Sequence, residues 1–421
     1  MVTARFDAVG LVVAVVLGLL FWLPAAWVAG RKMNWTVPAI LATAFSLSSA
    51  VVGIAAVTAW LLKASLTVAI GLSAAGALVL LALAVRFRRG GTVRVGAAGI
   101  IVGLLAGGLA FWERPWFAFT ADTFYHLAAA RSLIVTNAPL VTDPLHKTGA
   151  TGLDPTSGVF HTFLAGMSRV SDVGVEYVYT GFAALAAAAL IWALWALAER
   201  VSGSPTAATL AALGFAAFGV WGDFRMAGMP NRFGVAFLCV ALLALIESTA
   251  RDKRRNAALV ASAAGAAALL THLAPASAIA LFLIAAAAVT LLFGRRLRGG
   301  AAEAPTLAPL LAALLVSLPV AITKVGAVLA SPMTGQAEEL PEAFVWISAG
   351  LLAVKPGKYI GGGPTAFVLM AVIAAWAVYR GLRDRDGAAL TLAAFLAVPL
   401  LLLGFPPVTT LAARLSIYMI A

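Results

Sequence analysis

The segment FTADTFYHLAAARSL, residues 119–133, brings an acid, a histidine and an arginine together within ten residues. Asp122 and His126 are four residues apart, so on a helix they share a face, while Arg131 lies on another. A carboxylate beside an imidazole can act as a general base, and an arginine at a membrane surface can meet lipid headgroups. The spacing therefore leaves two interpretations open, and one of them is an acid–base site. The structural alternative is that Asp122 caps the helix and His126 is bonded to it.

The elements that must position these residues are two short helices at a membrane surface. The first is predicted to begin after Thr120 as its N-cap, directly behind a membrane span. The second is predicted within LDPTSGVFHTFLAGMSRV, with Asp154 as N-cap and Pro155 as first helical residue. Between them, TNAPLVTDPLHKTGATG is predicted to be loop, because it is rich in Pro, Gly, Asn and Asp.

The composition places these helices in a membrane protein. Hydrophobic residues make up 62% of the 421 residues and charged residues 11%, which a soluble domain cannot accommodate on its surface. Each apolar run must satisfy its own backbone hydrogen bonds in lipid, so an all-α polytopic transmembrane helical bundle of about 12 to 13 spans is predicted. The expected spans are roughly 9–29, 37–62, 65–85, 95–112, 175–198, 205–221, 233–248, 257–271, 273–293, 306–323, 364–380 and 388–404, with a last one from about 409.

The basic residues set the expected orientation. The net charge is +12, but the cations cluster in short loops between spans, so they indicate topology and not nucleic-acid binding. Seventeen of the 29 Lys and Arg lie in six loops that the span count puts on one side, which is therefore predicted to be cytoplasmic, with the N-terminus outside. These loops are residues 30–34, 86–94, 199–205, 250–256, 294–300 and 379–387.

The candidate catalytic and binding residues are predicted to lie on the opposite, external side. This side includes the long loop 113–174 and all four histidines, which lie in external segments or at their edges: His126, His146, His161 and His272. His146 and His161 are interpreted as structural. Zinc binding by Asp122 with these histidines is disfavoured, because the chain has no close His pair and only one cysteine, Cys239. Span centres hold almost no ionisable residues, which argues against an ion-coupled transporter.

At this loop the sequence resembles the GT-C superfamily of multi-span glycosyltransferases. Within it, the sequence is most similar in type to actinobacterial membrane proteins. The shared pattern is a span, an acidic residue opening an external helix (ADTFYHLAAARSL), and a proline-containing stretch leading to a second helix (LDPTSGVFHTFLAG). Three further features resemble those of the family: MPNRFG at a span entrance, THLAP between two helices, and a late external arginine, Arg414. The resemblance covers residues 95–421, and residues 1–94 are then an added three-span unit.

The resemblance implies transfer of a sugar from a polyprenyl-phosphate donor to a glycan, lipid or protein acceptor, on the external face of a prokaryotic plasma membrane. Asp122 would be the general base, with His126 beside it. Cations at external helix ends would bind the donor phosphate. No cofactor is certain, and Mg²⁺ or Mn²⁺ held by Asp122 and Glu113 is left open. The candidate phosphate-binding residues are Arg225, Arg232, His272, Lys324 and Arg414.

Two departures from the family pattern shape the expectation. Glu113 and Asp122 are nine residues apart, so the two acids do not form the family's usual paired-acid motif. The residues from Leu411 to Ala421 would cross only about half of a ~30 Å hydrocarbon core, which predicts either a fragment or a partial last helix. The alternatives are a polysaccharide polymerase or ligase that relies on external arginines, and a transporter or flippase of lipid-linked or polar solutes.

Overall fold

The computed structural model describes most of the chain up to Thr271 and parts of it beyond. The described residues are 2–87, 90–112, 121–141, 158–218, 230–248, 252–271, 279, 282, 285, 288–289, 291–293, 311–320, 322, 375–376, 378–379, 381–383, 390 and 393–394. At residues 2–6, 121–123, 217–218 and 230–233 the backbone is described without the side chains.

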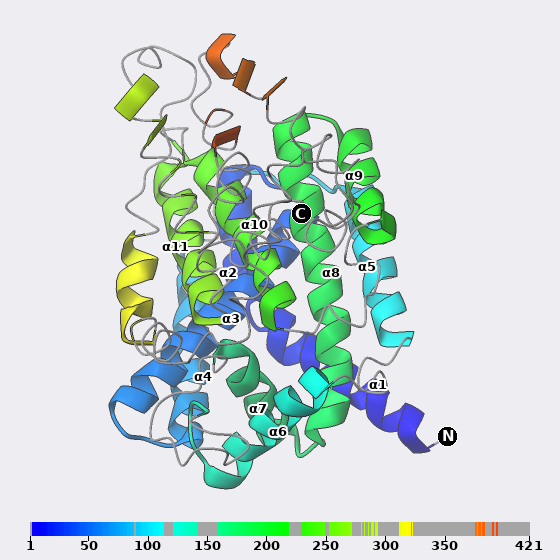
Figure 1. Cartoon of the computed structure of the whole chain (residues 1–421), viewed down its shortest axis with the longest axis vertical. Coiled ribbons are helices and arrows are strands. Elements are labelled where there is room, and N and C mark those ends of the chain that lie inside the picture. Colours follow the sequence, from blue (N-terminus) through cyan, green and yellow to red (C-terminus); the bar gives the residue numbers. More distant parts are fainter. Residues whose placement is uncertain are drawn as a thin grey trace, which may run out of the picture.

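Helices account for nearly all of the described chain, which is therefore all-α (Figure 1). Within it, the sole β contact is an isolated bridge between Thr36 and Arg94. In chain order the helices are α1 (Val2–Val15), η1, a π-helix (Val16–Leu20), α2 (Leu23–Met33), α3 (Val37–Leu61), α4 (Leu66–Arg86), α5 (Ala97–Trp112), α6 (Ala121–Thr136), α7 (Val159–Ser171), α8 (Val175–Ser202), α9 (Pro205–Phe218), α10 (Pro230–Glu247) and α11 (Arg254–Thr271).

Three of these helices are long and apolar enough to cross a membrane: α3, α4 and α8. The 25 residues of α3 rise about 38 Å, more than a ~30 Å hydrocarbon core. A fourth span is possible by length if the bent pair Asp7–Leu20 and Leu23–Met33 counts as one, and shorter apolar helices follow at Ala97–Trp112, Pro205–Ala216, Gly234–Glu247 and Leu311–Val320. Helices that could cross a membrane are thus present, and the count of 12 to 13 spans stays a prediction.

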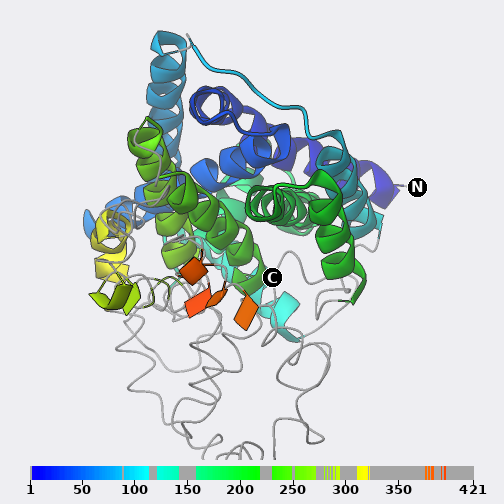
Figure 2. The ribbon, with the colours of Figure 1, turned by 90° about the horizontal axis from the view of Figure 1, so that it is seen from above.

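The three long helices differ in what surrounds them. The apolar windows of α3 and α8 are 78% and 89% buried by other helices, whereas that of α4 is 11% buried. From above, α4 stands at the edge of the bundle (Figure 2). It is apolar all round, and the described part of the chain covers only a small part of it, as expected for a helix whose outer face meets lipid. The interior of the bundle therefore forms around α3 and α8.

Close packing between α5 and α8 depends on small residues. Gly99, Gly103 and Gly107 recur every four residues on α5 and so share one face. A Cβ atom at Gly103 would overlap the indole of Trp192, and one at Gly99 would overlap that of Trp195. The glycines thus leave the space into which the two tryptophans of α8 fit, as in other membrane helix pairs that pack through small residues.

The first apolar stretch is bent by 46° between η1 and α2. Two causes coincide there: the π-helical turn of η1, and Pro24 in the first turn of α2, which cannot donate a backbone hydrogen bond. The indole Nε1 of Trp22 donates to the carbonyl of Leu17 at 2.7 Å, which satisfies one of the carbonyls at the break.

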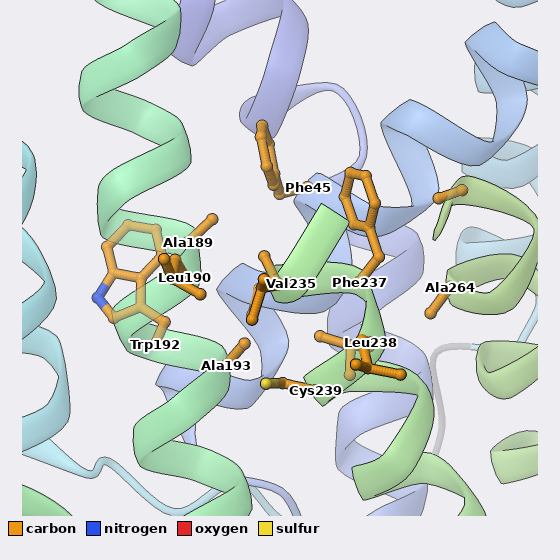
Figure 3. Close-up of a cluster of buried hydrophobic side chains, with 14 of the residues drawn as sticks. Phe45, Ala189, Leu190, Trp192, Ala193, Val235, Phe237, Leu238, Cys239 and Ala264 are labelled. Atoms are coloured by element: carbon orange, nitrogen blue, oxygen red, sulfur yellow. The ribbon is translucent and has the colours of Figure 1, made fainter. Parts of the chain in front are cut away.

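One large hydrophobic cluster joins the N-terminal helices to the rest of the bundle. Figure 3 shows its centre, where Phe45 of α3 lies near Phe237 of α10, while Trp192 lies on the other side of α8. Phe45 contacts Phe237 with ring centroids 5.7 Å apart. The predicted three-span unit 1–94 therefore shares its core with the helices that follow, and its status as a separate unit stays a prediction.

Four of the predicted basic loops meet at one end of the bundle. Arg31 donates to the carbonyl of Gly91 at 3.1 Å, and Arg94 forms an ion pair with Glu199 at 2.5 Å. Arg200 and Lys253 both pair with Glu247, at 2.5 and 2.8 Å. These contacts tie together the α2–α3, α4–α5, α8–α9 and α10–α11 connections, which we call the basic end. The opposite end carries α6, α7 and the N-terminus (Figure 1).

Candidate functional site

Helix α6 is fixed to the bundle by its C-terminal end. Asn137 follows the helix in the left-handed conformation (φ 54°), which asparagine tolerates better than most residues. Its backbone carbonyl accepts from the amide of Leu66 at 2.7 Å, and its side-chain oxygen accepts from the Thr67 hydroxyl at 3.1 Å. Asn137 thus ends α6 and satisfies amides of the first turn of α4, which would otherwise lack acceptors.

Helix α7 begins later than the sequence suggests. Asp154 and Pro155 were expected to open it, but it begins at Val159 with Gly158 as N-cap. A proline at the first helical position is a common signal, but Asp154 and Pro155 lie outside the described residues, and the helix opens with the buried residues Val159 and Phe160. The Thr162 hydroxyl donates to the carbonyl of Pro139 at 2.7 Å and so fastens α7 to the segment that follows α6.

The two helices bring two histidines into contact. Nδ1 of His126 on α6 lies 2.8 Å from Nε2 of His161 on α7. His126 is 9% exposed and His161 is fully buried. A hydrogen bond between two imidazole nitrogens needs one donor and one acceptor, so at most one ring of the pair is protonated on both nitrogens while the bond exists. The pair can therefore hold and pass a single proton.

Aromatic rings enclose the histidine pair and continue into the core. Phe160 meets the rings of His126 and His161 edge to face, with centroids 5.5 and 5.2 Å away. On its other side it contacts Phe182 of α8, at 5.7 Å, and Phe182 in turn contacts Phe45 of α3, at 5.9 Å. The histidines are thus held by packing against the two most buried long helices, which favours a fixed ring orientation.

An apolar groove lies along the same helix. It has a volume of about 320 Å³, and η1, α3, α4 and α7 line it. Its two hydroxyl groups already donate to backbone carbonyls: Ser73 to Ala69, and Thr162 to Pro139. Thr162 and Phe163, the residues directly after His161, belong to its wall. The groove therefore suits a hydrocarbon chain, and α7 contributes both to its wall and to the histidine pair.

Arg131 was expected to face lipid headgroups, and the structure gives it a protein partner. Its guanidinium forms an ion pair with Glu176 in the first turn of α8, at 3.0 Å. Its side chain is still 62% exposed, so the pair lies at the surface. Of the apolar residues on the same helix, Phe124 is 55% exposed, whereas Leu127 packs against the core.

Most of the other predicted site residues lie outside the described part of the chain: Glu113, His146, Arg225, His272, Lys324 and Arg414. Asp122 and Arg232 are described by their backbone alone. Asp122 lies in the first turn of α6, one turn before His126, as predicted. Arg232 lies at the entrance of a helix as expected for MPNRFG, since Pro230 and Asn231 are the first residues of α10.

The structure bears on metal binding only in part. Among the side chains that it describes, no three His, Cys, Asp or Glu residues come together as a possible metal site. The pair of His126 and His161 supplies two imidazoles, and a third ligand would have to come from outside these side chains. A divalent metal held by Asp122 and Glu113 stays a prediction, because both side chains lie outside them.

His161 is the site residue that the sequence did not reveal, since it was interpreted as structural. A signal was nevertheless present: His161 and His126 each lie early in one of the two helices of the 113–174 segment, which the sequence predicts to be external. Comparisons of the chain with protein-family models, with curated proteins and with solved structures found no match.

Proposed function

We propose that this chain is a polytopic membrane glycosyltransferase of GT-C type, which transfers a sugar from a polyprenyl-phosphate donor to a glycan, lipid or protein acceptor. The observation that supports it best is that one helix, α7, carries His161 of the buried histidine pair and also lines an apolar groove. Proton-handling groups and a space for a hydrocarbon chain on one helix suit a substrate that has a reactive polar head and a lipid tail.

In the proposed reaction, the acceptor hydroxyl attacks the anomeric carbon of the sugar. The bond from that carbon to the phosphate oxygen breaks, and polyprenyl phosphate leaves. Asp122 takes the proton of the acceptor hydroxyl as general base. His126 is a positioning residue that acts through Asp122. Since its Nδ1 is engaged by His161, any proton exchange between His126 and Asp122 has to use Nε2.

The leaving phosphate needs cations at the depth of the lipid headgroups. We assign this role to the external cations Arg232 and Arg414 first, with Arg225, His272 and Lys324 as further candidates. The basic loops described above all gather at the other end of the bundle, so the positive-inside rule assigns the histidine pair to the external face.

The proposal is tested by incubating the purified full-length chain with a panel of polyprenyl-phosphate sugars and measuring sugar transfer. Asp122→Asn keeps the shape of the side chain and removes its basicity, so transfer should fall by at least ~10²-fold. Asp172→Asn is the matched control: Asp172 is exposed at the end of α7 with φ 56°, a conformation that asparagine also adopts. No transfer from any donor, or equal rates in the two variants, would contradict the proposal.

A second candidate is a transporter of lipid-linked or polar solutes. The bend of 46° between η1 and α2 favours it, because broken helices often form solute sites in transporters. Detergent-solubilised protein distinguishes the two functions: an enzyme still forms product there, whereas a transporter shows activity only as movement of solute across sealed vesicles.

A further inference from the structure

A second cavity lies at the basic end, far from the histidine pair. It has a volume of about 260 Å³ and lies where the α2–α3, α4–α5, α8–α9 and α10–α11 connections meet. Its wall is mostly polar and charged, in contrast to the apolar groove. The polar residues that line it are Asn34, Arg94, Glu199, Arg200, Glu247 and Lys253.

Both carboxylates of this cavity are buried and already paired. Glu199, whose side chain is 8% exposed, accepts from both terminal nitrogens of Arg94, at 2.5 and 3.1 Å. Glu247, at 3% exposed, accepts from Nε of Arg200 and from Nζ of Lys253. Three cations face two carboxylates, so the cavity carries one excess positive charge.

The excess charge comes with unused hydrogen-bond donors. Arg200 binds Glu247 through Nε, and its two terminal NH₂ groups bond no acceptor in the described part of the chain. Lys253 donates once, to Glu247, although an ammonium group has three donors. Arg94, in contrast, uses Nε on the carbonyl of Asn34 and both terminal nitrogens on Glu199. The donors that remain for a ligand are therefore those of Arg200 and Lys253.

We propose that this cavity binds a phosphate oxyanion, either in the headgroup of an anionic phospholipid or as free phosphate. A planar guanidinium with two free NH₂ groups can bond two phosphate oxygens at once, and a neighbouring ammonium adds a point charge. Arg31 and Lys32 are further cations at the same end, and they raise the local concentration of anions. Basic pockets between membrane helices on the cytoplasmic side suit such headgroups.

The ion pairs by themselves could serve only to fasten the helix ends together. That role needs a cation beside Glu247, which lysine at position 200 can also supply. Oxyanion binding needs the two NH₂ groups of Arg200 as well, which lysine lacks. Arg200→Lys therefore separates the two roles. Arg86→Gln is the matched control, since it removes a cation from the same end outside the cavity.

The experiment measures phosphatidylglycerol binding to the delipidated full-length chain by native mass spectrometry, with phosphatidylcholine as reference lipid. The parent and Arg86→Gln should bind phosphatidylglycerol preferentially, and Arg200→Lys should bind it about tenfold more weakly, the scale of one lost charge-assisted contact. Thermal unfolding without lipid shows whether Arg200→Lys is folded. If it is not, Lys253→Gln replaces it, with a weaker binding expected for the same reason.

A second arm identifies the source of the phosphate. Inorganic phosphate at millimolar concentration should raise the Tm of the parent, and not of Arg200→Lys, if free phosphate is sufficient. If phosphatidylglycerol alone stabilises the parent, the ligand is the lipid headgroup. The proposal is overturned if Arg200→Lys binds phosphatidylglycerol as tightly as the parent, or if neither probe shows binding that depends on Arg200.

Discussion

His126 and His161 are 35 residues apart in the chain, and their ring nitrogens Nδ1 and Nε2 are 2.8 Å apart in the fold. The contact joins helices α6 and α7 at a buried point. Because the bond needs one donor and one acceptor nitrogen, the two rings form one functional unit and their contributions to transfer should not be independent.

The first prediction tests that unit. His126→Ala should lower transfer by about 10²-fold, and His161→Ala by about tenfold, because it removes the partner of Nδ1. His161→Gln can still donate a hydrogen bond and should recover part of the loss. The double variant should be no slower than His126→Ala alone. Rates measured in all four variants check this, and losses that multiply would show that the two rings act separately.

The second prediction concerns the apolar groove. A Cβ atom at Gly166 would meet only Ile70, at 3.7 Å, so a leucine there extends into the groove without a backbone clash. Gly166→Leu should raise KM for a long-chain polyprenyl donor by about tenfold and leave KM for a short-chain analogue unchanged.

The matched control for the groove is Gly71→Leu on α4. A Cβ atom there meets nothing within 4 Å, and Gly71 does not line the groove. This variant should have the KM values of the parent for both donors. An equal effect of Gly166→Leu on long and short donors would mean that the lipid chain lies elsewhere.

The third prediction is topological. Single cysteines at Thr148 and Ala227 should react with an impermeant thiol reagent in intact cells. Thr148 lies in the loop 113–174 and Ala227 between the expected spans 205–221 and 233–248, and both segments are expected outside. Thr206→Cys, at an exposed position in the first turn of α9 at the basic end, should react only after the membrane is permeabilised. The native Cys239 is buried, at 3% exposed, and gives little background. Labelling of Thr206→Cys in intact cells would reverse the orientation.

The fourth prediction concerns the contact of α5 with α8. Gly103→Ala places a methyl group against the indole of Trp192 and should lower the free energy of unfolding by about 1 to 3 kcal/mol. Gly108→Ala, on the same helix, meets nothing within 4 Å and should change it by less than about 0.5 kcal/mol. Denaturant titration of the purified chain measures both values, and equal effects would show that the small residues of α5 do not determine the packing.

The long helices could be predicted from the sequence because their length follows from apolar composition. The expected spans 37–62 and 65–85 correspond to α3 (Val37–Leu61) and α4 (Leu66–Arg86). The span expected at 175–198 is longer in the structure, since α8 continues to Ser202 through polar residues that no hydropathy pattern includes. The shared end of four basic loops was also predicted, because alternating spans place every second loop on the same side.

The histidine pair could not be predicted in the same way. Helical spacing relates Asp122 to His126 within one helix, and it contains no information on how α6 packs against α7. The contact with His161 depends on tertiary interactions, such as the bond from Thr162 to Pro139 and the packing of Phe160 on Phe182. The start of α7 was placed at Pro155 because a local capping signal was followed, whereas the helix in the structure begins at Val159.

The ion pairs at the two ends of α8 constrain how the whole bundle can move. Glu176 in its first turn is held by Arg131, and Glu199 in its last turn by Arg94, about 35 Å along the helix. A slide of α8 by one turn would separate both pairs at once and would also withdraw Trp192 from the space at Gly103. We therefore expect α8 to keep its position in the bundle. An opening that admits a substrate would then come from movement of the surrounding helices.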